Sequence, residues 1–488
     1  MIRNRKFRFV EPGSRRGRPF NAWITRWPLL GPITLASILE RRGYDVAVYN
    51  ENISGPLLEN AEALEDVCSA DVVGISIMTP TAMRGYEIAD RIRKECPNAT
   101  IVFGGVHATF CPEEAAQRGD IVVCGEGENV IEPIARGEIT SGIIKADPPA
   151  DLNVLPPINH FLMRDFHKLM ARSRRRELYE LPAMTSRGCP YGCTYCSVTR
   201  MFGRKVRRQS VDKVYSDLMH YASQGFRKFF FYDDNFTDNR AWTKELLERI
   251  APLKFRFNAQ ARVDFHWADR SRRKRDEELL RTLRRGGGDV LYVGYETIDD
   301  ETARLWRKGY RGAHRLEQRL AEDTKILHDS GFWIHGMFVL GPEHTERTAE
   351  KIVDFSLRNS LESMQISILT PIPGTPLMDQ MREHLLFTDY PQDWNYYDGT
   401  HCVYNHGRLG IEQVQRTILD AHRRFYRWGL SARRLRAVAS GTVPLRDKLA
   451  LLWSHLNIAR RTLSDWREET KHFLELARSK MKMANSLA

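Results

Sequence analysis

Three cysteines stand close together in the segment Arg187-Gly188-Cys189-Pro190-Tyr191-Gly192-Cys193-Thr194-Tyr195-Cys196. Their spacing is C-x3-C-x2-C, on a short loop that contains glycine and proline. Thiolates are soft, charged ligands that suit iron–sulfur clusters. A cubane cluster has four irons, so three cysteines leave one iron without a protein ligand. A small molecule can bind and react at such an open iron.

A zinc site is the alternative reading of the same cysteines. Structural zinc usually takes four protein ligands. No fourth Cys or His stands near the segment at zinc-finger spacing. The pattern therefore favours an iron–sulfur cluster with an open iron.

The region that begins just before the cysteines alternates between strand-like and helix-like segments. The strand-like segments are residues 183–186, 228–232, 255–262, 290–296, 333–341 and 365–371. Strands alternating with helices in this way predict a partial parallel barrel, (β/α)6, open on one side. Polar side chains, among them Asp233, Asp234 and Glu296, stand at the carboxyl ends of these strands. Because barrel enzymes place their chemistry at those ends, we expect the site there.

The first 145 residues predict a separate α/β domain. Strand-like runs occur at residues 8–12, 45–49, 72–77, 100–103 and 121–123, and several are followed by glycine. The run at 72–77 is almost continuously apolar, as expected for a parallel strand that is covered on both faces. This alternation predicts a doubly wound, Rossmann-like sheet that binds a ligand along its carboxyl edge.

We therefore expect four parts: an α/β domain over 1–145, a linker over 146–183, the barrel over 184–385 and a mainly helical C-terminal domain over 386–488. Two helices with one apolar face each are predicted in the last part. Their apolar residues are Ile411, Val414, Ile418, Ala421 and Phe425 in the first, and Leu449, Leu452, Trp453, Leu456, Leu463 and Trp466 in the second. The second helix has a basic opposite face. We expect it to pack over the open side of the barrel; the alternative is contact with a membrane surface.

The cysteine spacing, with aromatic Tyr195 just before the last cysteine, resembles that of the radical S-adenosylmethionine (SAM) superfamily. The resemblance implies that Cys189, Cys193 and Cys196 hold a [4Fe–4S] cluster whose open iron binds SAM. It also implies that an electron from the cluster cleaves SAM to a 5′-deoxyadenosyl radical.

Further residues take roles by the same resemblance. Asp233 and Asp234 occupy the segment that contacts the SAM amino group in this superfamily. Arg262 would pair with the SAM carboxylate, Glu296 would bind the ribose hydroxyls, and Tyr195 would lie near the adenine. For each of them the alternative is an ordinary helix cap or a surface ion pair.

Three loops of the first domain, at 76–80, 104–109 and 125–128, resemble in sequence and spacing the cobalamin-binding domain that precedes many radical SAM domains. The resemblance implies a corrin cradled mostly by backbone groups. The residues that it places there are Ser76, Thr79, Gly104, Gly105, His107, Gly125, Glu126 and Gly127. For His107 the alternative is a hydrogen bond to its own loop.

One departure from that family concerns the lower ligand of cobalt. Cobalamin domains that use a histidine carry D-x-H-x-x-G, which the first 145 residues lack. One D-x-H elsewhere in the chain, Asp264-Phe265-His266, lies in the barrel and is followed by Asp269 where glycine belongs. We therefore expect cobalamin to bind without a histidine as its lower ligand.

Together the two resemblances identify the chain as similar to the cobalamin-binding radical SAM methylases and cyclases of the class B type. They imply cobalamin-dependent methylation of an unactivated carbon. The alternative in the same class is a radical rearrangement, cyclisation or oxidation without methyl transfer, with or without cobalamin. A rival from another class is a regulator that binds nucleic acid through the arginine-rich runs at 172–176 and 270–275. Solvated loops explain those runs better, so nucleic acid is not an expected partner.

Composition and charge indicate where the protein works and what its partners are. The 488 residues carry a net charge of +12, with no apolar signal segment and no stretch of membrane-spanning length. Eight cysteines in a chain of this size do not predict a disulfide framework. We expect Cys68, Cys96, Cys111 and Cys124 to be small buried thiols. The expected location is the cytoplasm, with peripheral membrane contact as an option. The expected partners are a small-molecule or lipid substrate and an electron donor such as flavodoxin or ferredoxin.

Overall fold

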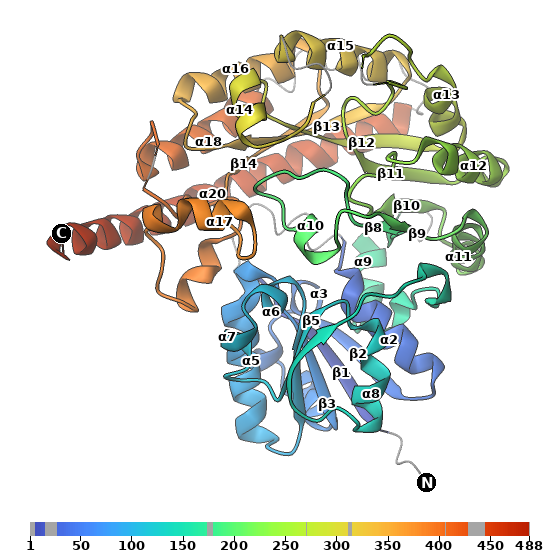
Figure 1. The fold of residues 1–488 in the computed structure, drawn as a ribbon, viewed down its shortest axis with the longest axis vertical. Helices are drawn as coiled ribbons and strands as arrows, with labels where there is room; N and C mark the ends of the chain where they lie inside the picture. Colours follow the sequence, from blue (N-terminus) through green and yellow to red (C-terminus); the bar gives the residue numbers. More distant parts are fainter. Residues whose placement is uncertain are drawn as a thin grey trace.

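Two parallel β-sheets, one in each half of the chain, face each other across a domain interface in the computed structural model (Figure 1). The structure describes residues 5–14, 27–172, 179–269, 271–310, 315–405, 407–427 and 445–487. The N-terminal sheet lies below and the C-terminal half above in Figure 1.

The N-terminal sheet confirms a doubly wound domain. Its strands are β1 (Lys6–Glu11), β2 (Asp45–Asn50), β3 (Val72–Ser76), β4 (Thr100–Gly104), β5 (Ile121–Gly125) and β6 (Gly142–Ala146). The order is β2-β1-β3-β4-β5-β6, with every pair parallel. The chain reverses direction across the sheet between β1 and β3, and ligands bind at such a switch point. β6 was not predicted, because this edge strand is largely exposed and lacks a clear apolar pattern.

Helices cover both faces of this sheet. They are α2 (Leu30–Arg41), α3 (Glu51–Ser54), α4 (Ala61–Cys68), α5 (Ala82–Glu95), α6 (Val106–Phe110), α7 (Pro112–Ala115) and α8 (Ile131–Arg136). Helix α5 shows why they form: Tyr86, Ala89 and Ile92 recur at helical spacing and are fully buried. The segment between the domains contains α9 (Phe166–Arg172).

The second sheet is the predicted partial barrel. Its strands are β7 (Glu180–Ala183), β10 (Lys228–Phe231), β11 (Arg256–Ala261), β12 (Gly288–Glu296), β13 (Trp333–Leu340) and β14 (Ser363–Ile368). They are all parallel and lie in the sequential order β7-β10-β11-β12-β13-β14. The accompanying helices are α10 (Val198–Met201), α11 (Val211–Ser223), α12 (Arg240–Ile250), α13 (Glu277–Arg285), α14 (Asp300–Leu305), α15 (Leu316–Asp329) and α16 (Glu346–Arg358).

The first barrel strand differs from the predicted segment 183–186. It ends at Ala183, and the chain then enters β8 (Ser186–Arg187), which pairs antiparallel with β9 (Arg207–Arg208). The change of course has a local cause: the Thr185 amide and hydroxyl both donate to the buried carboxylate of Asp233. The cysteine loop therefore starts from a small ribbon beside the barrel and not directly from a barrel strand.

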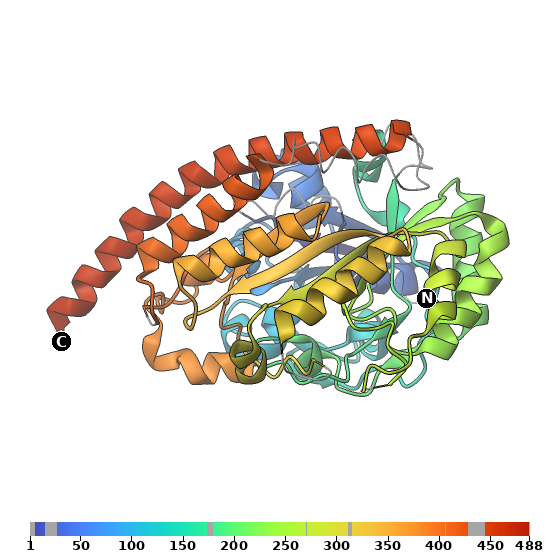
Figure 2. The same ribbon diagram turned by 90° about the horizontal axis from the view of Figure 1, so that it is seen from above.

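The C-terminal part contains α17 (Pro376–Met381), α18 (Ile411–Arg427) and the long α20 (Leu445–Leu487). Helix α18 buries its predicted face, including Ile418 and Phe425, and contacts β14 and α16. Helix α20 runs along α18, outside the last barrel strand (Figure 2). Of its predicted apolar face, Trp466 is buried against His422. For positions 449, 452, 453 and 456 the structure describes the helix but not the side chains.

The structure corrects the prediction for two of the cysteines outside the loop. Cys68 and Cys96 are joined in a disulfide between the ends of α4 and α5, so the prediction of two separate buried thiols was wrong. Their distance in sequence hides that these two helices end side by side.

Most of the arginine-rich run at 172–176, and Arg270 of the other run, lie outside the described residues. Within the described part, no helix is long and apolar enough to cross a membrane.

Candidate functional site

The cysteine loop is fixed at both ends by backbone contacts. Gly188 has a φ of +98°, and a Cβ added to it would lie 2.9 Å from the Gly203 carbonyl oxygen, so only glycine fits. The Cys189 amide donates to the same carbonyl at 3.3 Å. In the middle of the loop, the Thr194 amide donates to the Trp306 carbonyl at 3.1 Å. These contacts hold the loop in one shape.

The three predicted ligand thiols lie on this loop, unpaired and half-buried. Burial raises the pKa of Cys189, and it raises the pKa of Cys196 to about 12. The charges of Cys193 and Asp234 raise the pKa of both thiols further. Buried thiolates close together need a cation beside them to be stable. Three soft donors in this setting fit an iron–sulfur cluster. In the described part of the chain, no three Cys, His, Asp or Glu side chains gather as ligands of a single metal ion.

Asp233 binds the residues that directly precede the cysteine loop. Its carboxylate is 1% exposed and accepts hydrogen bonds from the Thr185 amide and hydroxyl and from the Ser186 hydroxyl. The Asp233 carboxylate, which the sequence analysis expected to contact the SAM amino group, thus already accepts these protein hydrogen bonds. The structure thus places Asp233 under the loop base, where it fixes the start of the loop.

Asp234 faces a cavity between the two domains. Burial, strengthened by the charge of Asp233, raises its pKa to about 7. An anionic side chain here would be stabilised by a cationic group in the cavity, because opposite charge offsets the cost of burial. Asp234 is therefore the better placed of the two aspartates for a ligand amine.

Arg262 and Glu296, at the ends of β11 and β12, already have protein partners. Arg262 pairs with Asp264 at 3.0 Å, donates to the carbonyl oxygens of Lys308 and Gly309, and lies over the ring of Tyr191 at 4.0 Å. Since Tyr191 belongs to the cysteine loop, Arg262 supports that loop directly.

Glu296 accepts from Lys308 Nζ at 2.9 Å. Its φ is +59°, a conformation that is unfavourable for a residue with a side chain and that clusters at functional sites. The Tyr195 ring meets Trp306 edge to face at a centroid distance of 5.8 Å. The Glu296 charge also acts on the buried phenol of Tyr195 and helps to raise its pKa. The two predicted residues Tyr195 and Glu296 thus interact electrostatically.

The cavity between the domains has a volume of about 320 Å³ and a mostly apolar wall. On the N-terminal side it is lined by loop residues that the sequence had singled out: Ser76, Gly104, Gly105, Gly125, Glu126 and Gly127. On the other side it is lined by Met184, Arg187, Met201, Phe202, Tyr232 and Asp234. A Cβ added to Gly104 would meet no atom within 4 Å, so the backbone there is open to a large planar ligand. The open backbone and the mostly apolar wall are the surfaces that a corrin would contact.

Thr79 and His107 do not line this cavity. Instead, His107 Nδ1 and Thr79 Oγ1 lie 3.3 Å apart, and His107 Nε2 lies 3.1 Å from Glu114 Oε1. His107 is fully buried and also packs edge to face against Trp394 of the C-terminal part. The partners of its ring are Thr79, Glu114 of α7 and Trp394 of a distant aromatic loop, and not its own backbone.

The ion pairs across the domain interface were missed by the sequence analysis. Arg187, directly before the cysteine loop, pairs with Glu126 and with Glu128, the latter at 2.7 Å. Arg207 of β9 also pairs with Glu126. All four side chains are at most 14% exposed. The G-E-G-E sequence was a visible signal, but its arginine partners lie dozens of residues away.

Comparison with known proteins supports both halves of this site. Residues 25–135 match the family model of the B12 binding domain, and residues 184–356 match that of the radical SAM superfamily. The chain is 26% identical over 440 residues to bacteriochlorophyllide d C-12(1)-methyltransferase of Chlorobaculum tepidum, covering 88% of this chain and 89% of the relative. It is also 26% identical over 375 residues to the C-8(2)-methyltransferase of that organism, covering 73% and 78%.

The fold is also that of a solved structure. The radical SAM methyltransferase TsrM of Kitasatospora setae, with cobalamin and a [4Fe–4S] cluster bound, superposes with a TM-score of 0.67 at 17% identity, covering 96% of this chain and all of that one. The arrangement of a B12-binding sheet beneath a radical SAM barrel is thus shared. The chain belongs to the radical SAM enzymes that carry an N-terminal B12-binding domain, and its cofactors are a [4Fe–4S] cluster, SAM and cobalamin.

Proposed function

We propose that the enzyme methylates a carbon atom of an apolar, ring-containing small molecule. One observation carries the proposal: the cavity lined by the B12-domain glycines is also lined by Asp234 and Tyr232 at the barrel mouth. A methyl donor on one wall and a radical source on the other would then reach the same substrate. The two bacteriochlorophyllide methyltransferases, similar over most of their length, support a ring system as the substrate class.

In this reaction the bound cofactors supply the methyl group and the hydrogen-abstracting radical. The chain's own residues hold and shield them. Cys189, Cys193 and Cys196 would hold the cluster, and Asp234 would bind the SAM amine. Glu296 would accept hydrogen bonds from the SAM ribose next to Tyr195. These roles rest on position and chemistry, namely strand ends that converge on one loop.

The apolar wall has a separate part in the proposal. Met184, Met201, Phe202 and Tyr232 line the cavity between the cysteine loop and the glycine cradle. Apolar side chains there exclude water from the space in which reactive species would meet. Exclusion of water protects a radical from side reactions.

The setting of the reaction is also proposed. We expect the enzyme to work in the reducing cytoplasm, because thiolates that hold a cluster must stay reduced. An electron-donor protein such as a flavodoxin or ferredoxin would supply the reducing electron. A contact between the basic α20 and anionic lipid is the remaining proposal, and co-sedimentation of the chain with anionic vesicles tests it.

The test is anaerobic turnover of the reconstituted enzyme with bacteriochlorophyllide d, reductant and SAM. We expect deoxyadenosine, S-adenosylhomocysteine and a product heavier by one CH2 unit. A product of unchanged mass, or one that has lost hydrogens, would instead show rearrangement or oxidation. No conversion of this pigment, with methylation of another ring compound, would retain the reaction type and reject the pigment.

A further inference from the structure

The connecting segment, residues 306–310, directly follows α14 and is joined to the cysteine loop in two ways. Trp306 accepts the Thr194 amide with its carbonyl oxygen at 3.1 Å. Arg262 donates to two later carbonyl oxygens of the segment, at 3.0 and 3.1 Å, and its guanidinium lies over the Tyr191 ring. The segment is therefore joined to Thr194 directly and to Tyr191 through Arg262.

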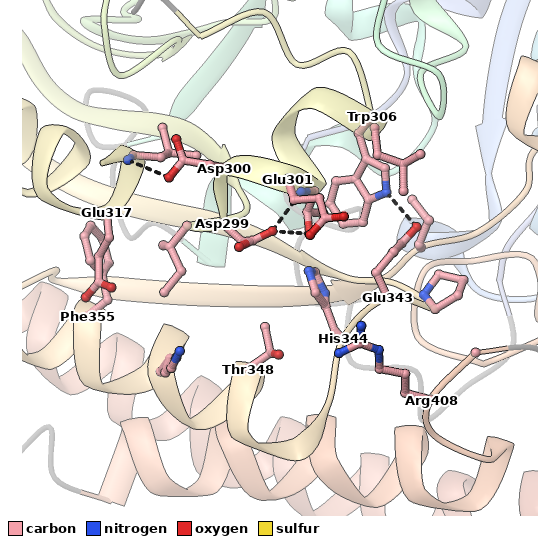
Figure 3. A pocket seen from close by; sticks show the side chains of 18 of the residues that line it. Asp299, Asp300, Glu301, Trp306, Glu317, Glu343, His344, Thr348, Phe355 and Arg408 are labelled. Atoms are coloured by element: carbon pink, nitrogen blue, oxygen red, sulfur yellow. Dashed lines mark hydrogen bonds between the residues drawn. The ribbon is translucent and has the colours of Figure 1, made fainter. Parts of the chain in front are cut away.

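The start of the connecting segment is anchored among the helices α14, α15 and α16. There the indole of Trp306 is 2% exposed and forms part of the wall of a cavity of about 1150 Å³ (Figure 3). Its Nε1 donates to Glu343 Oε1 at 3.4 Å, and the His344 ring meets it edge to face at 5.4 Å between centroids. Because Glu343 and His344 lie in the turn between β13 and α16, these contacts fix the segment relative to the barrel.

The same segment holds Glu296, the last residue of β12. Lys308 Nζ lies 2.9 Å from Glu296 Oε1, and the two side chains are 8% and 15% exposed. An ammonium beside a largely buried carboxylate offsets the cost of burying its charge. Among the described residues, Lys308 is the one hydrogen-bond partner that the structure gives the Glu296 carboxylate. Oε1 is thus occupied, and Oε2 remains for a ligand.

The backbone around this ion pair is shaped to accommodate it. A Cβ added to Gly294 would lie 2.6 Å from Glu296 Oε1 and 3.2 Å from Lys308 Nζ, so a side chain there would displace the pair. The pairing of β12 with β13 shifts register between Gly294 and Glu296, and such an irregularity re-aims a side chain. Glu296 also has a φ of +59°, a conformation that persists only when its surroundings impose it. The pair with Lys308 is one of these constraints.

We propose that Lys308 is a positioning residue for SAM, because it fixes the Glu296 carboxylate in the direction from which Oε2 meets the SAM ribose. A SAM molecule held both at the cluster and at Glu296 needs these two points at a constant separation. The connecting segment contacts the cysteine loop and Glu296, so it sets that separation. The inference rests on the proposed function, which assigns the ribose to Glu296. Lys308 acts through Glu296 and is given no contact with the reacting atoms.

The test is a double-mutant cycle of Lys308→Met and Glu296→Gln that measures SAM affinity. Anaerobic equilibrium dialysis is carried out on the cluster-loaded enzyme without reductant, so that SAM is bound and not cleaved. Each single variant should bind SAM about tenfold more weakly, as expected for a lost hydrogen bond to a charged group. The double variant should bind SAM as Glu296→Gln does, because Lys308 acts only through Glu296. Lys325→Met, which removes an exposed lysine paired with Asp329 on α15, is the matched control and should bind SAM normally.

Further readouts separate positioning from a general loss of structure. Lys308→Arg keeps the charge and should recover most of the SAM affinity that Lys308→Met loses. Gly294→Ala keeps both charges but displaces the pair, so it should weaken SAM binding as Lys308→Met does. Iron content should be normal in all variants. With reductant but no methyl acceptor, the KM for SAM in deoxyadenosine formation should rise about tenfold in Lys308→Met at nearly unchanged kcat, because a ribose contact binds SAM and the transition state alike. Since no methyl acceptor is present, failure of the methylation proposal would leave these results intact.

Four outcomes would overturn the inference. Normal SAM binding by Lys308→Met, with weakened binding by Glu296→Gln, would reject the role of Lys308 and leave the ribose assignment intact. Normal SAM binding by Glu296→Gln would reject that assignment, and with it the role of Lys308. Losses that add in the double variant would show that Lys308 acts on SAM independently of Glu296. A loss of iron in Lys308→Met would show that the lysine supports the cluster loop and not the SAM ribose.

Discussion

The Arg187 guanidinium and the Glu128 carboxylate lie 2.7 Å apart in the domain interface, and each side chain is 6% exposed. Arg187 belongs to the barrel half and directly precedes Gly188 and Cys189, whereas Glu128 belongs to the B12-binding domain. Glu126 completes the contact from the same loop. The pair therefore connects the cluster loop with the loop that cradles the second cofactor.

Glu128→Gln should destabilise the chain by about 3 kcal/mol, because it leaves a buried guanidinium with less compensating charge. It should also loosen the coupling between the two loops. Denaturant unfolding measures the first effect, and cobalamin affinity with and without the cluster measures the second. The control is Glu95→Gln, which breaks the exposed pair with Arg91 and should cost below about 1 kcal/mol. An equal loss of unfolding free energy in both variants would show that the interface pair contributes no more to stability than the exposed pair.

Gly105→Ala and Gly104→Ala should separate folding from cofactor binding. At Gly105, φ is +93° and an added Cβ would lie 2.7 Å from the Ile77 carbonyl oxygen, so we expect a loss of about 2 kcal/mol or more. At Gly104 an added Cβ meets nothing within 4 Å and projects at the cavity wall. That variant should keep its stability and bind cobalamin more weakly. Thermal unfolding and equilibrium dialysis of cobalamin decide the matter; normal cobalamin binding by Gly104→Ala would refute the proposed cradle.

Cys193→Ser should abolish assembly of the iron–sulfur cluster, since a serine oxygen is a poor ligand for the iron that the Cys193 thiolate would hold. Iron content and visible absorbance after anaerobic reconstitution measure this. Cys124→Ala, a cysteine at the end of β5 outside the loop, should assemble a normal cluster. If both variants kept their iron, the assignment of the loop would be wrong.

The pH dependence of stability should reflect Glu11, which ends β1 at the domain interface. Burial raises its pKa from 4.5 to about 8. Between these two values the folded chain holds a proton that the unfolded chain has released, so the free energy of unfolding falls as pH rises from about 4.5 to 8 and levels off above. Glu11→Gln should remove this contribution and be more stable than the unmodified chain above pH 8. Denaturant unfolding at several pH values measures it, and an unchanged pH profile in Glu11→Gln would assign the dependence to other groups.

Local patterns explain what could be predicted from the sequence. The run at 72–77 and the helical spacing of Tyr86, Ala89 and Ile92 indicate buried elements, because burial of apolar surface follows the period of the element. The cysteine loop could also be predicted, because its three thiol ligands lie close together in the chain. Edge strand β6 escaped prediction because an exposed edge carries no such pattern.

The sequence by itself therefore determined the two domain types and predicted the cluster loop. Only the tertiary structure decided that Asp233 supports the loop, that His107 turns away from the cavity to Glu114, and that Cys68 meets Cys96. It alone brought Arg187 to Glu126, 61 positions away. The physical reason is that such pairings depend on how strands are ordered and domains docked, and these are set by the sum of many burial contacts and by no single local motif.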